Sequence, residues 1–591
     1  MSHTFLVGLL TAWLALTLGA QGAAARNIHV AITGSDSAVG TKEAPYLTIG
    51  QAASVAQPGD TVIVHTGAYR EWVKPPRGGT SEDRRITYRA AAGEEVLVKG
   101  SQRVTSWMAE GGGVWKAELP NDFFGDYNPY ALKLSGGWLE YGQWHHRGDV
   151  YLDGEALLET QTPQEVTERK GTWHGEVGEK TTIVRANFGE AKPNEALTEI
   201  NVRPCVFFPE KAGLSYITVD GLHLMHSAEN WQPPGLETQM GTIGPRMGKH
   251  WVIQNCRVTN ARCVGIVLGH AAGVKLDDID AFGDHMVRNN IIRRCGQAGI
   301  AGQKGATRCL VEGNLIEDTN YRKEFGGWET AAIKFHQSVD TVICGNLIRR
   351  VPLRSHGAFG IWMDWGNQGT RITGNIIYDT GAAGIFVEMN HGPILIDNNV
   401  LIGGGIRSNS EGTVFAHNLF VDCGFNMGSD TERQSEYYRP HMRQVVARKV
   451  GVPQDDKWFN NLFVGRGLDG VKNASGYASD YNVFLGGAKK STFGDGHSVV
   501  AAAGADVKRK GASLGVTIEF SIGEPLPGPG PWVDANLVGV LPTVGQTIED
   551  RDGKGITVDT DLTGAKRTRA IPSPLAELKP GRNRIEWIRK D

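Results

Sequence analysis

Two carboxylate residues stand at equivalent places in two consecutive repeats of this 591-residue chain. Asp364 lies eleven residues before Asn375, and Glu388 lies eleven residues before Asn399. If each repeat is one coil of a stacked β-structure, the two carboxylates occupy neighbouring strands, about 4.8 Å apart. Retaining glycosidases use two carboxyl groups roughly 5–5.5 Å apart, one as nucleophile and one as acid/base. The spacing therefore indicates this chemistry and leaves open which carboxylate takes which role.

The repeat that sets this spacing is a β-rich run, one or two polar residues, an asparagine and two apolar residues. Its asparagines are separated by 24, 32, 29, 24, 19, 43 and 21 residues, which is typical of a solenoid with loops inserted at its corners. We expect asparagine to recur because it tolerates the left-handed backbone of a tight bend and can hydrogen-bond between coils. Leucine-rich repeat spacing is absent, so we predict a parallel β-helix. The repeat asparagines are Asn290, Asn314, Asn346, Asn375, Asn399, Asn418, Asn461 and Asn482.

Three segments ahead of these asparagines align by apolar alternation: Ile333-Lys-Phe-His, Ile361-Trp-Met-Asp and Ile385-Phe-Val-Glu. Alternate residues of a strand share a face, so we expect the first and third residues of each segment to point into the solenoid. The other residues are predicted to form an exposed patch, and exposed aromatic side chains beside polar groups indicate a binding surface, here one suited to a sugar. Its predicted members are Lys334, His336, Trp362, Asp364, Trp365, Phe386 and Glu388, with Glu329 in the preceding loop and Gln303 and Asn409 at the two ends.

The whole chain predicts an all-β fold, a parallel β-helix with an inserted or discontinuous β-sandwich. Gly is abundant (78 residues) and strand-like runs are short. A helical patch from Thr48 is expected to cap the open end of the solenoid. The predicted parts are a signal peptide (1–25), the cap with the first coils (26–100), a β-sandwich insertion (101–212), the β-helix with the active site (213–490) and C-terminal strands that complete or add to the sandwich (491–591).

Composition narrows the classes of partner. The apolar run from Phe5 to Ala20 before Ala23-Ala24-Ala25 indicates a secretory signal, hence a secreted or periplasmic protein with no membrane contact after cleavage. A net charge of −3 without a basic stripe argues against nucleic-acid binding. Seven cysteines in so long a chain do not indicate a disulfide framework. Cys256, Cys295, Cys309 and Cys344 lie in or beside apolar runs and are expected to be buried free thiols, with a single disulfide left open.

Two other polar motifs are expected to be structural. His145-His146 lacks partners at metal-ligand spacing and is expected in a surface loop. The segment that begins at Asp550 (Asp-Arg-Asp-Gly-Lys-Gly) lacks the downstream Glu of an EF-hand and is expected to be a turn. We therefore expect no cofactor and no metal, and a structural calcium ion is not indicated.

Dispersed motifs of the chain resemble glycoside hydrolase family 120, the β-xylosidases built on a right-handed parallel β-helix. The resemblance runs from Asn27 to the region of Asn482 and more faintly through the tail. The matching stretches are Gly59–His65, Tyr69–Pro75, Arg85–Tyr88, Phe123–Gly125, Asn128–Tyr130, Gly148–Leu152, Glu199–Arg203, Glu329, Asp364-Trp365, Gln368–Arg371, Val387-Glu388 and His391–Pro393.

The resemblance implies that Asp364 is the nucleophile, Glu388 the acid/base and Glu329 a third carboxylate of the site. It also implies a β-sandwich intermixed with the helix and a homo-oligomer. Arg371 and His391 fall in the motifs that carry the site, and we expect them to contact the substrate. For His391, which is followed by Gly-Pro, a role in a turn is an equal alternative. Trp328 precedes Glu329 where a family member carries His, so it too is a predicted substrate contact.

The function expected from these observations is a secreted, retaining, exo-acting β-xylosidase that releases xylose from xylo-oligosaccharides. Two alternatives stay open. A polysaccharide lyase could use Lys334 or Arg371 near a uronate, but it would need calcium or basic groups, and the patch is richer in carboxylates. A non-catalytic carbohydrate-binding protein would bind sugar but not hydrolyse it, so Asp364→Ala would remove no activity.

Overall fold

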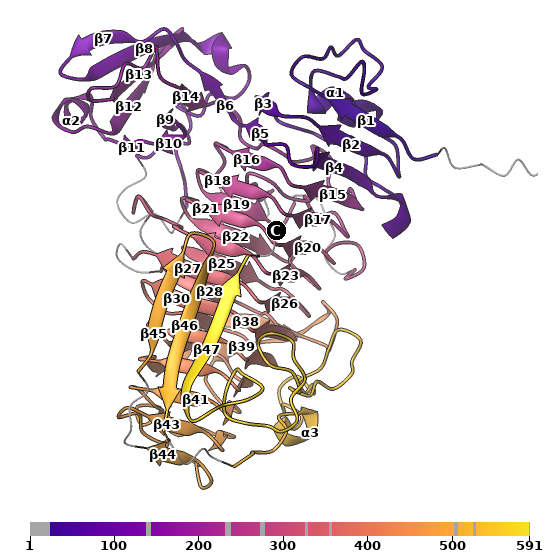
Figure 1. The fold of residues 1–591 in the computed structure, drawn as a ribbon, viewed down its shortest axis with the longest axis vertical. Coiled ribbons are helices and arrows are strands. Elements are labelled where there is room, and N and C mark those ends of the chain that lie inside the picture. The colour runs from indigo at the N-terminus through magenta and orange to yellow at the C-terminus, as the bar shows by residue number, and fades with distance from the viewer. Residues whose placement is uncertain are drawn as a thin grey trace, which may run out of the picture.

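The structure of the protein is a computed structural model. It describes residues 24–136, 144–230, 238–271, 278–325, 329–353, 357–501, 506–523 and 528–589. Most of the predicted signal peptide and Trp328 lie outside these residues. In Figure 1 the coils of a solenoid are stacked along the long axis of the molecule. The insertion lies at one end of the stack, and the strands β45, β46 and β47 lie along the side of the solenoid.

The predicted parallel β-helix is confirmed, and three parallel sheets form its walls. Sheet A contains β1 (Asn27–Val30), β2 (Thr61–Val64), β4 (Ile86–Ala90), β15 (Ile217–Asp220), β17 (Val252–Gln254), β20 (Met286–Arg288), β23 (Leu310–Glu312), β26 (Val342–Cys344), β29 (Thr370–Thr373), β32 (Ile394–Asp397), β35 (Thr413–Ala416), β40 (Lys457–Phe459) and β42 (Ala478–Asp480). Sheet B contains β3 (Gly67–Tyr69), β5 (Val96–Lys99), β16 (His223–Met225), β18 (Arg257–Thr259), β21 (Ile291–Arg293), β24 (Leu315–Glu317), β27 (Leu347–Val351), β30 (Ile376–Thr380), β33 (Val400–Ile402), β36 (Leu419–Val421), β41 (Leu462–Val464), β43 (Val483–Leu485) and β44 (Val499–Ala501). Sheet C, the shortest, contains β19 (Val264–Val267), β22 (Ala298–Gln303), β25 (Ala331–His336), β28 (Phe359–Asp364), β31 (Ile385–Glu388), β34 (Ile406–Ser408) and β37 (Phe425–Met427).

The repeat asparagines form a continuous hydrogen-bonded ladder inside the solenoid. The Oδ1 atom of Asn375 accepts from the backbone N–H of Asn346 at 3.0 Å and from its side-chain Nδ2 at 2.9 Å. The same pair of bonds joins each asparagine to the next, from Asn290 to Asn482. The predicted bonding between coils is therefore present. The expected left-handed backbone is not at these asparagines but at the residue before each, for example Gly374 (φ 65°).

A short helix covers the N-terminal end of the solenoid, as predicted. α1 (Ile49–Val55) begins after Thr48, whose side chain accepts from the backbone N–H of Gln51. Its apolar side, Ile49, Ala52 and Ala53, joins the main core of the helix. The segment before the helix occupies the outer edge of β1, where the backbone N–H groups of His29 and Ala31 donate to the carbonyls of Gly40 and Tyr46, so this edge is not free to pair with another chain.

The predicted sandwich insertion forms two facing sheets. One holds β11 (Leu158–Glu159), β12 (Thr172–Val177), β13 (Thr181–Asn187), β8 (Val114–Pro120) and β7 (Met108–Gly111), with α2 (Pro163–Glu168) at its side; the other holds β10 (Glu155–Ala156), β9 (Val150–Leu152), β14 (Thr198–Asn201) and β6 (Ser101–Arg103). Trp173 and Val184 of the first sheet pack with Val150 and Ile200 of the second in one core.

The insertion is joined to the helix by a buried network of charges. Glu159 of the insertion pairs with Arg262 of the helix at 2.9 Å, and Arg262 also pairs with Glu324 at 2.7 Å. Both neighbouring histidines, His145 and His146, pair with Glu159. The prediction that these histidines lie in a surface loop is wrong for His145, which is buried, whereas His146 is half-buried. A ring nitrogen of each lies within 3.2 Å of a carboxylate that the insertion buries against the helix.

The C-terminal strands add a separate layer instead of completing the sandwich. β45 (Lys508–Ala512), β46 (Gly515–Ile522) and β47 (Gly581–Ile588) form their own antiparallel sheet. Val516, Ile518 and Phe520 pack on the outer apolar face of sheet B. The Asp550 segment is a turn, as expected, because its Oδ1 accepts from the backbone N–H groups of Asp552 and Lys554. The remaining short helices are α3 (Ala535–Val538), η1 (Glu82–Arg84) and η2 (Asn121–Phe124).

Two further expectations concern thiols and membranes. All seven cysteines are free and six are buried. The prediction of buried thiols therefore holds for Cys256, Cys295 and Cys309, whereas Cys344 is half-buried. Among the described residues, no helix is long and apolar enough to cross a bilayer.

Candidate active site

The candidate residues form a column across neighbouring strands of sheet C. The register pairs Gln303 with His336, His336 with Asp364, and Asp364 with Glu388. Each belongs to the end of its strand, from β22 to β31. The two carboxylates thus stand directly opposite each other on adjacent parallel strands, as the equal spacing to Asn375 and Asn399 predicts.

The prediction that this face is exposed is wrong. The alternation itself is correct, because the residues expected to point inward lie in the helix core. On the other face, Trp362 and Phe386 form a second buried cluster with Phe359, and Asp364 and Glu388 are each only 4% exposed. Alternation determines which side of a strand a residue faces, but not which other segment covers that side.

A hairpin inserted between two coils provides part of this cover. β38 (Asp430–Tyr438) pairs with β39 (Val445–Gly451) in an antiparallel two-stranded sheet. From it, Ser435 donates to the backbone carbonyl of Met389, and Glu436 accepts from Gln337 at 3.1 Å. The hairpin therefore lies over the ends of β25 and β31.

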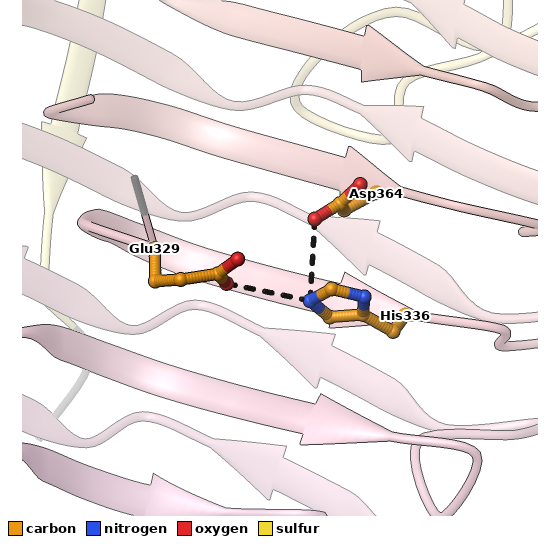
Figure 2. A group of neighbouring side chains, drawn as sticks. All are labelled: Glu329, His336 and Asp364. Carbon is orange, nitrogen blue, oxygen red and sulfur yellow. Dashed lines mark ion pairs between the residues drawn. The ribbon is translucent and has the colours of Figure 1, made fainter. Parts of the chain in front are cut away.

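Lys334 lies between two carboxylates of the site. Its Nζ is 2.6 Å from Asp364 Oδ2 and 2.7 Å from Glu329 Oε2, and it is 3.0 Å from the centre of the Trp362 ring. His336 Nε2 lies 3.2 Å from Asp364 Oδ2 and 3.5 Å from Glu329 Oε2, as Figure 2 shows. Glu329, His336 and Asp364 are close enough together to ligate a cation, but the Lys334 ammonium already contacts both carboxylates.

The surroundings of Asp364 and Glu388 drive their proton affinities apart. Burial raises the pKa of Asp364, but the charges of His336 and Lys334 outweigh this and hold the pKa below its ordinary value. Burial, and next the charge of Asp364, raise the pKa of Glu388 to about 8, against the opposing effects of Lys334 and Arg433. At neutral pH the pair therefore holds one carboxylate and one carboxylic acid.

Sequence reasoning listed Trp362 as a substrate contact and not as a donor to Glu388, and it missed Arg433. The indole Nε1 of Trp362 donates to Glu388 Oε2 at 2.9 Å. Arg433 of the hairpin donates to Glu388 Oε1 at 2.6 Å. The available signal was the interval of 43 residues between Asn418 and Asn461, the longest in the repeat, which contains the whole hairpin.

The structure places the other predicted contacts differently. Arg371 is on β29 of sheet A and pairs with Asp397 at 2.7 Å, so it does not join the column. His391 is buried, with Nδ1 2.8 Å from Glu411 and Nε2 2.9 Å from Ser435. Both its ring nitrogens are thus engaged by protein, and the predicted sugar contact is not supported.

Four predicted positions remain, three of them among the described residues. Trp365 is half-buried, follows β28 in a left-handed conformation (φ 31°) and lies under Arg433. Asn409 follows β34 and accepts from the backbone N–H of Met389, so it supports the turn after Glu388. Glu329 has a left-handed backbone (φ 77°), which is uncommon outside glycine. Trp328 lies outside the described residues.

Comparisons with known proteins agree with this architecture. Residues 104–172 match the family model "Glycoside hydrolase 120, insertion domain", and residues 243–426 match "Right handed beta helix region". Residues 32–74 match a domain family of unknown function. An uncharacterized protein of Bacillus subtilis, YwoF, is 36% identical over 73 residues, and the match spans 15% of that protein's length.

Solved structures resemble this chain over most of its length. The structure described as the complex of XylC with xylose is 32% identical, with a TM-score of 0.86, and the match covers 95% of this chain and 100% of that one. A structure described as a glycoside hydrolase is 14% identical over 68% of this chain and 95% of that one, with a TM-score of 0.49.

The helix, the insertion and the paired carboxylates together define a glycoside hydrolase with a right-handed β-helix. With 32% identity across nearly all of both chains, the protein belongs to glycoside hydrolase family 120.

Proposed function

We propose that this protein is a retaining, exo-acting β-xylosidase that releases xylose from xylo-oligosaccharides. The observation that carries the proposal is the direct pairing of Asp364 with Glu388 on adjacent strands. Strands of one sheet lie about 4.8 Å apart, which suits the separation of a retaining pair and leaves no room for the water of an inverting one. The similar XylC structure, described with xylose, supports the choice of sugar.

In the first step Asp364 is the nucleophile. Its Oδ2 is held by Lys334 and His336, while Oδ1 has no hydrogen-bond partner among the described residues. Oδ1 attacks the anomeric carbon, the bond from that carbon to the leaving oxygen breaks, and Glu388 gives the leaving oxygen its proton. A glycosyl ester on Asp364 and a Glu388 carboxylate result.

In the second step Glu388 acts as the base. It takes a proton from water, the water oxygen attacks the anomeric carbon, and the ester bond to Asp364 breaks. The sugar leaves with its original configuration, and both carboxyl groups return to their starting protonation. Because the ester has removed the charge of Asp364, Glu388 is a weaker proton acceptor than in the free enzyme, and Arg433 stabilises its ionised form.

The site is suited to the end of a chain. Its catalytic carboxyls are almost fully buried, and this burial favours the end of a chain over the interior of a continuous polymer. Glu329 and His336 line the same side as Asp364 and are the proposed hydroxyl contacts. Trp362 donates to Glu388 and packs against Phe386, and half-buried Trp365 is the proposed aromatic contact.

The wider setting is also proposed. The signal-like segment 1–25 supports secretion or a periplasmic location, the family resemblance supports a homo-oligomer, and the mechanism requires no cofactor. Lys334 supplies the positive charge beside the nucleophile that a metal could otherwise supply.

The test is hydrolysis of aryl β-D-xylosides beside other aryl glycosides, with product configuration followed by NMR. We expect β-xyloside cleavage with retention; an inverted first product contradicts the proposed mechanism, and an unsaturated product that absorbs in the ultraviolet would indicate a lyase. Azide should rescue Asp364→Ala as the inverted glycosyl azide and Glu388→Ala as the retained one. The opposite pattern would exchange the two roles.

A further inference from the structure

Both carboxyl oxygens of Glu388 are occupied in the free protein, although the proposed reaction needs one of them. Oε2 accepts from the Trp362 indole at 2.9 Å, and Oε1 accepts from Arg433 at 2.6 Å. A leaving-group oxygen, and later a water, must come within hydrogen-bond distance of the acid/base oxygen. One of the two donors must therefore give way when the substrate binds.

The two donors differ in how firmly they are held. Trp362 is 1% exposed and packs against Phe359 and Phe386 at ring distances of 4.7 and 5.3 Å. The Arg433 side chain is 46% exposed and reaches Glu388 from the hairpin, outside the solenoid. Moving the indole would open a cavity in the cluster, whereas moving the guanidinium needs only side-chain rotation. Arg433 is the donor that can yield.

Arg433 has a second carboxylate to hold it when it does. Its Nε is 2.7 Å from Asp430 Oδ2, and its terminal nitrogen is 2.6 Å from the same atom. Asp430 Oδ1 also accepts from the backbone N–H groups of Glu432 and Arg433. The guanidinium is thus tethered beside Glu388 even when it is not bonded to it.

The backbone of the hairpin is shaped to present this side chain. Asp430 pairs with Gly451 and Gln434 pairs with Val450, so residues 431–433 bulge out of the ladder. Bulges next to active sites commonly redirect a side chain. Here the bulge places Arg433 over Trp365, with the guanidinium 5.7 Å from the ring centre.

Building on the proposed function, we propose that Arg433 is a positioning residue which holds Oε1 of Glu388, yields that oxygen to the leaving group, and then stabilises the carboxylate left by proton donation. The reacting oxygen of Glu388 is accordingly Oε1, and Oε2 stays fixed by Trp362. The hairpin is thereby part of the acid/base machinery and not only a cover.

The charges around Glu388 determine the direction in which each variant should shift the pH dependence of kcat/KM. From the helix, Asp364 disfavours its ionised form and Lys334 favours it; from the hairpin, Arg433 favours it. Asp430 in turn neutralises part of the charge of Arg433. Removing Arg433 should therefore move the basic limb of kcat/KM to higher pH, and removing the charge of Asp430 should move it to lower pH.

The experiment compares Arg433→Gln, Arg433→Lys and Asp430→Asn with Arg448→Gln. Arg448 is a matched control, because it pairs with Glu436 on the same hairpin at 2.7 Å and is exposed. Each variant is assayed on xylobiose, whose leaving group needs a proton, and on 2,4-dinitrophenyl β-D-xyloside, whose leaving group does not. Thermal unfolding of each variant checks that the fold is retained.

For Arg433→Gln we expect kcat/KM on xylobiose to fall by about 10- to 100-fold, part of the 10²–10⁴ that general acid catalysis contributes. The dinitrophenyl substrate should change by about twofold or less, since it bypasses that contribution. The kcat/KM of Arg433→Lys on xylobiose should lie between those of wild type and Arg433→Gln, because lysine keeps the positive charge but lacks the bidentate donors of the guanidinium. Arg448→Gln should match wild type.

An equal loss on both substrates, or basic limbs that do not move in opposite directions for Arg433→Gln and Asp430→Asn, would overturn the proposal. Its failure is distinct from failure of the proposed function. If the wild-type protein cleaves another glycoside instead of xylosides, the function is wrong, and the same comparison on that glycoside still tests Arg433.

Discussion

Lys334→Gln is the perturbation that most directly tests how the site holds its charges. Lys334 is fully buried and contacts Asp364 and Glu329 at 2.6 and 2.7 Å. Removing one partner of a buried ion pair costs about 3–5 kcal/mol, because a charge is left without compensation. The site can avoid most of this cost by binding a proton on one of the two carboxylates.

The direction of the pH effect follows from the native pKa of Asp364, which lies below its ordinary value. A carboxyl of this kind stabilises the fold above its unfolded pKa and loses that contribution as pH falls through the folded one. Without Lys334 the pKa of Asp364 rises, so the acidic limb of kcat/KM moves to higher pH. The pKa of Glu388 also rises above its value of about 8, because Lys334 lowers it in the wild type. Both limbs should therefore move upward together.

The assay is the pH dependence of kcat/KM on an aryl β-xyloside, with urea unfolding measured in parallel. Lys99→Gln is the control, because Lys99 of β5 in sheet B forms a buried pair with Glu199 at 2.8 Å outside sheet C. It should lose less stability, since Glu199 still pairs with Arg70, and it should keep the wild-type pH profile. A folded Lys334→Gln protein with an unmoved acidic limb would refute the inference that Lys334 holds down the pKa of Asp364.

The other predictions concern the acid/base, the ladder and the insertion. Wild-type kcat/KM should decline above pH about 8 as Glu388 loses its proton. Glu388→Gln, assayed on the dinitrophenyl xyloside, should lack this decline. A decline that persists in the variant contradicts the assignment of Glu388 as the acid/base. Asn375→Ala should cost about 1–3 kcal/mol for each buried group it leaves unpaired, measured by urea unfolding, whereas the exposed Asn426→Ala should cost much less. Glu159→Gln should lower the free energy of unfolding by about 3–5 kcal/mol, because Arg262 loses one of its buried carboxylate partners. The control Glu176→Gln removes an exposed pair with Arg185 and should cost about 1 kcal/mol or less. Equal losses would show that the buried network does not hold the insertion.

Much of the helix is predictable because every coil obeys the same local rule. Each coil needs apolar residues on its inner face and an asparagine that hydrogen-bonds to the next coil. The structural repeat therefore appears as a repeat in the sequence. The expected role of asparagine is only half correct. The ladder is present, but the left-handed residue is the preceding one, for example Asn398 before Asn399 (φ 57°), and period alone cannot separate adjacent positions.

The candidate site is less predictable where it depends on segments far apart in the chain. Arg371 lies only seven residues after Asp364, yet it belongs to another sheet because the coil turns a corner between them. Arg433 lies 45 residues after Glu388 and contacts it through the hairpin. Distance along the sequence is a poor guide in a solenoid, where residues one coil apart are neighbours and residues within one coil can face different sides.

The sequence by itself determined the parallel coils, the inward face of sheet C and the pairing of Asp364 with Glu388, because all three depend on periodicity. Only the tertiary structure decided that this pair is buried, that Lys334 lies between two carboxylates, and that Trp362 and Arg433 hold Glu388. These features depend on what packs over the outer face of the helix. A repeat pattern contains no information about that cover, since the hairpin is an insertion outside the repeat.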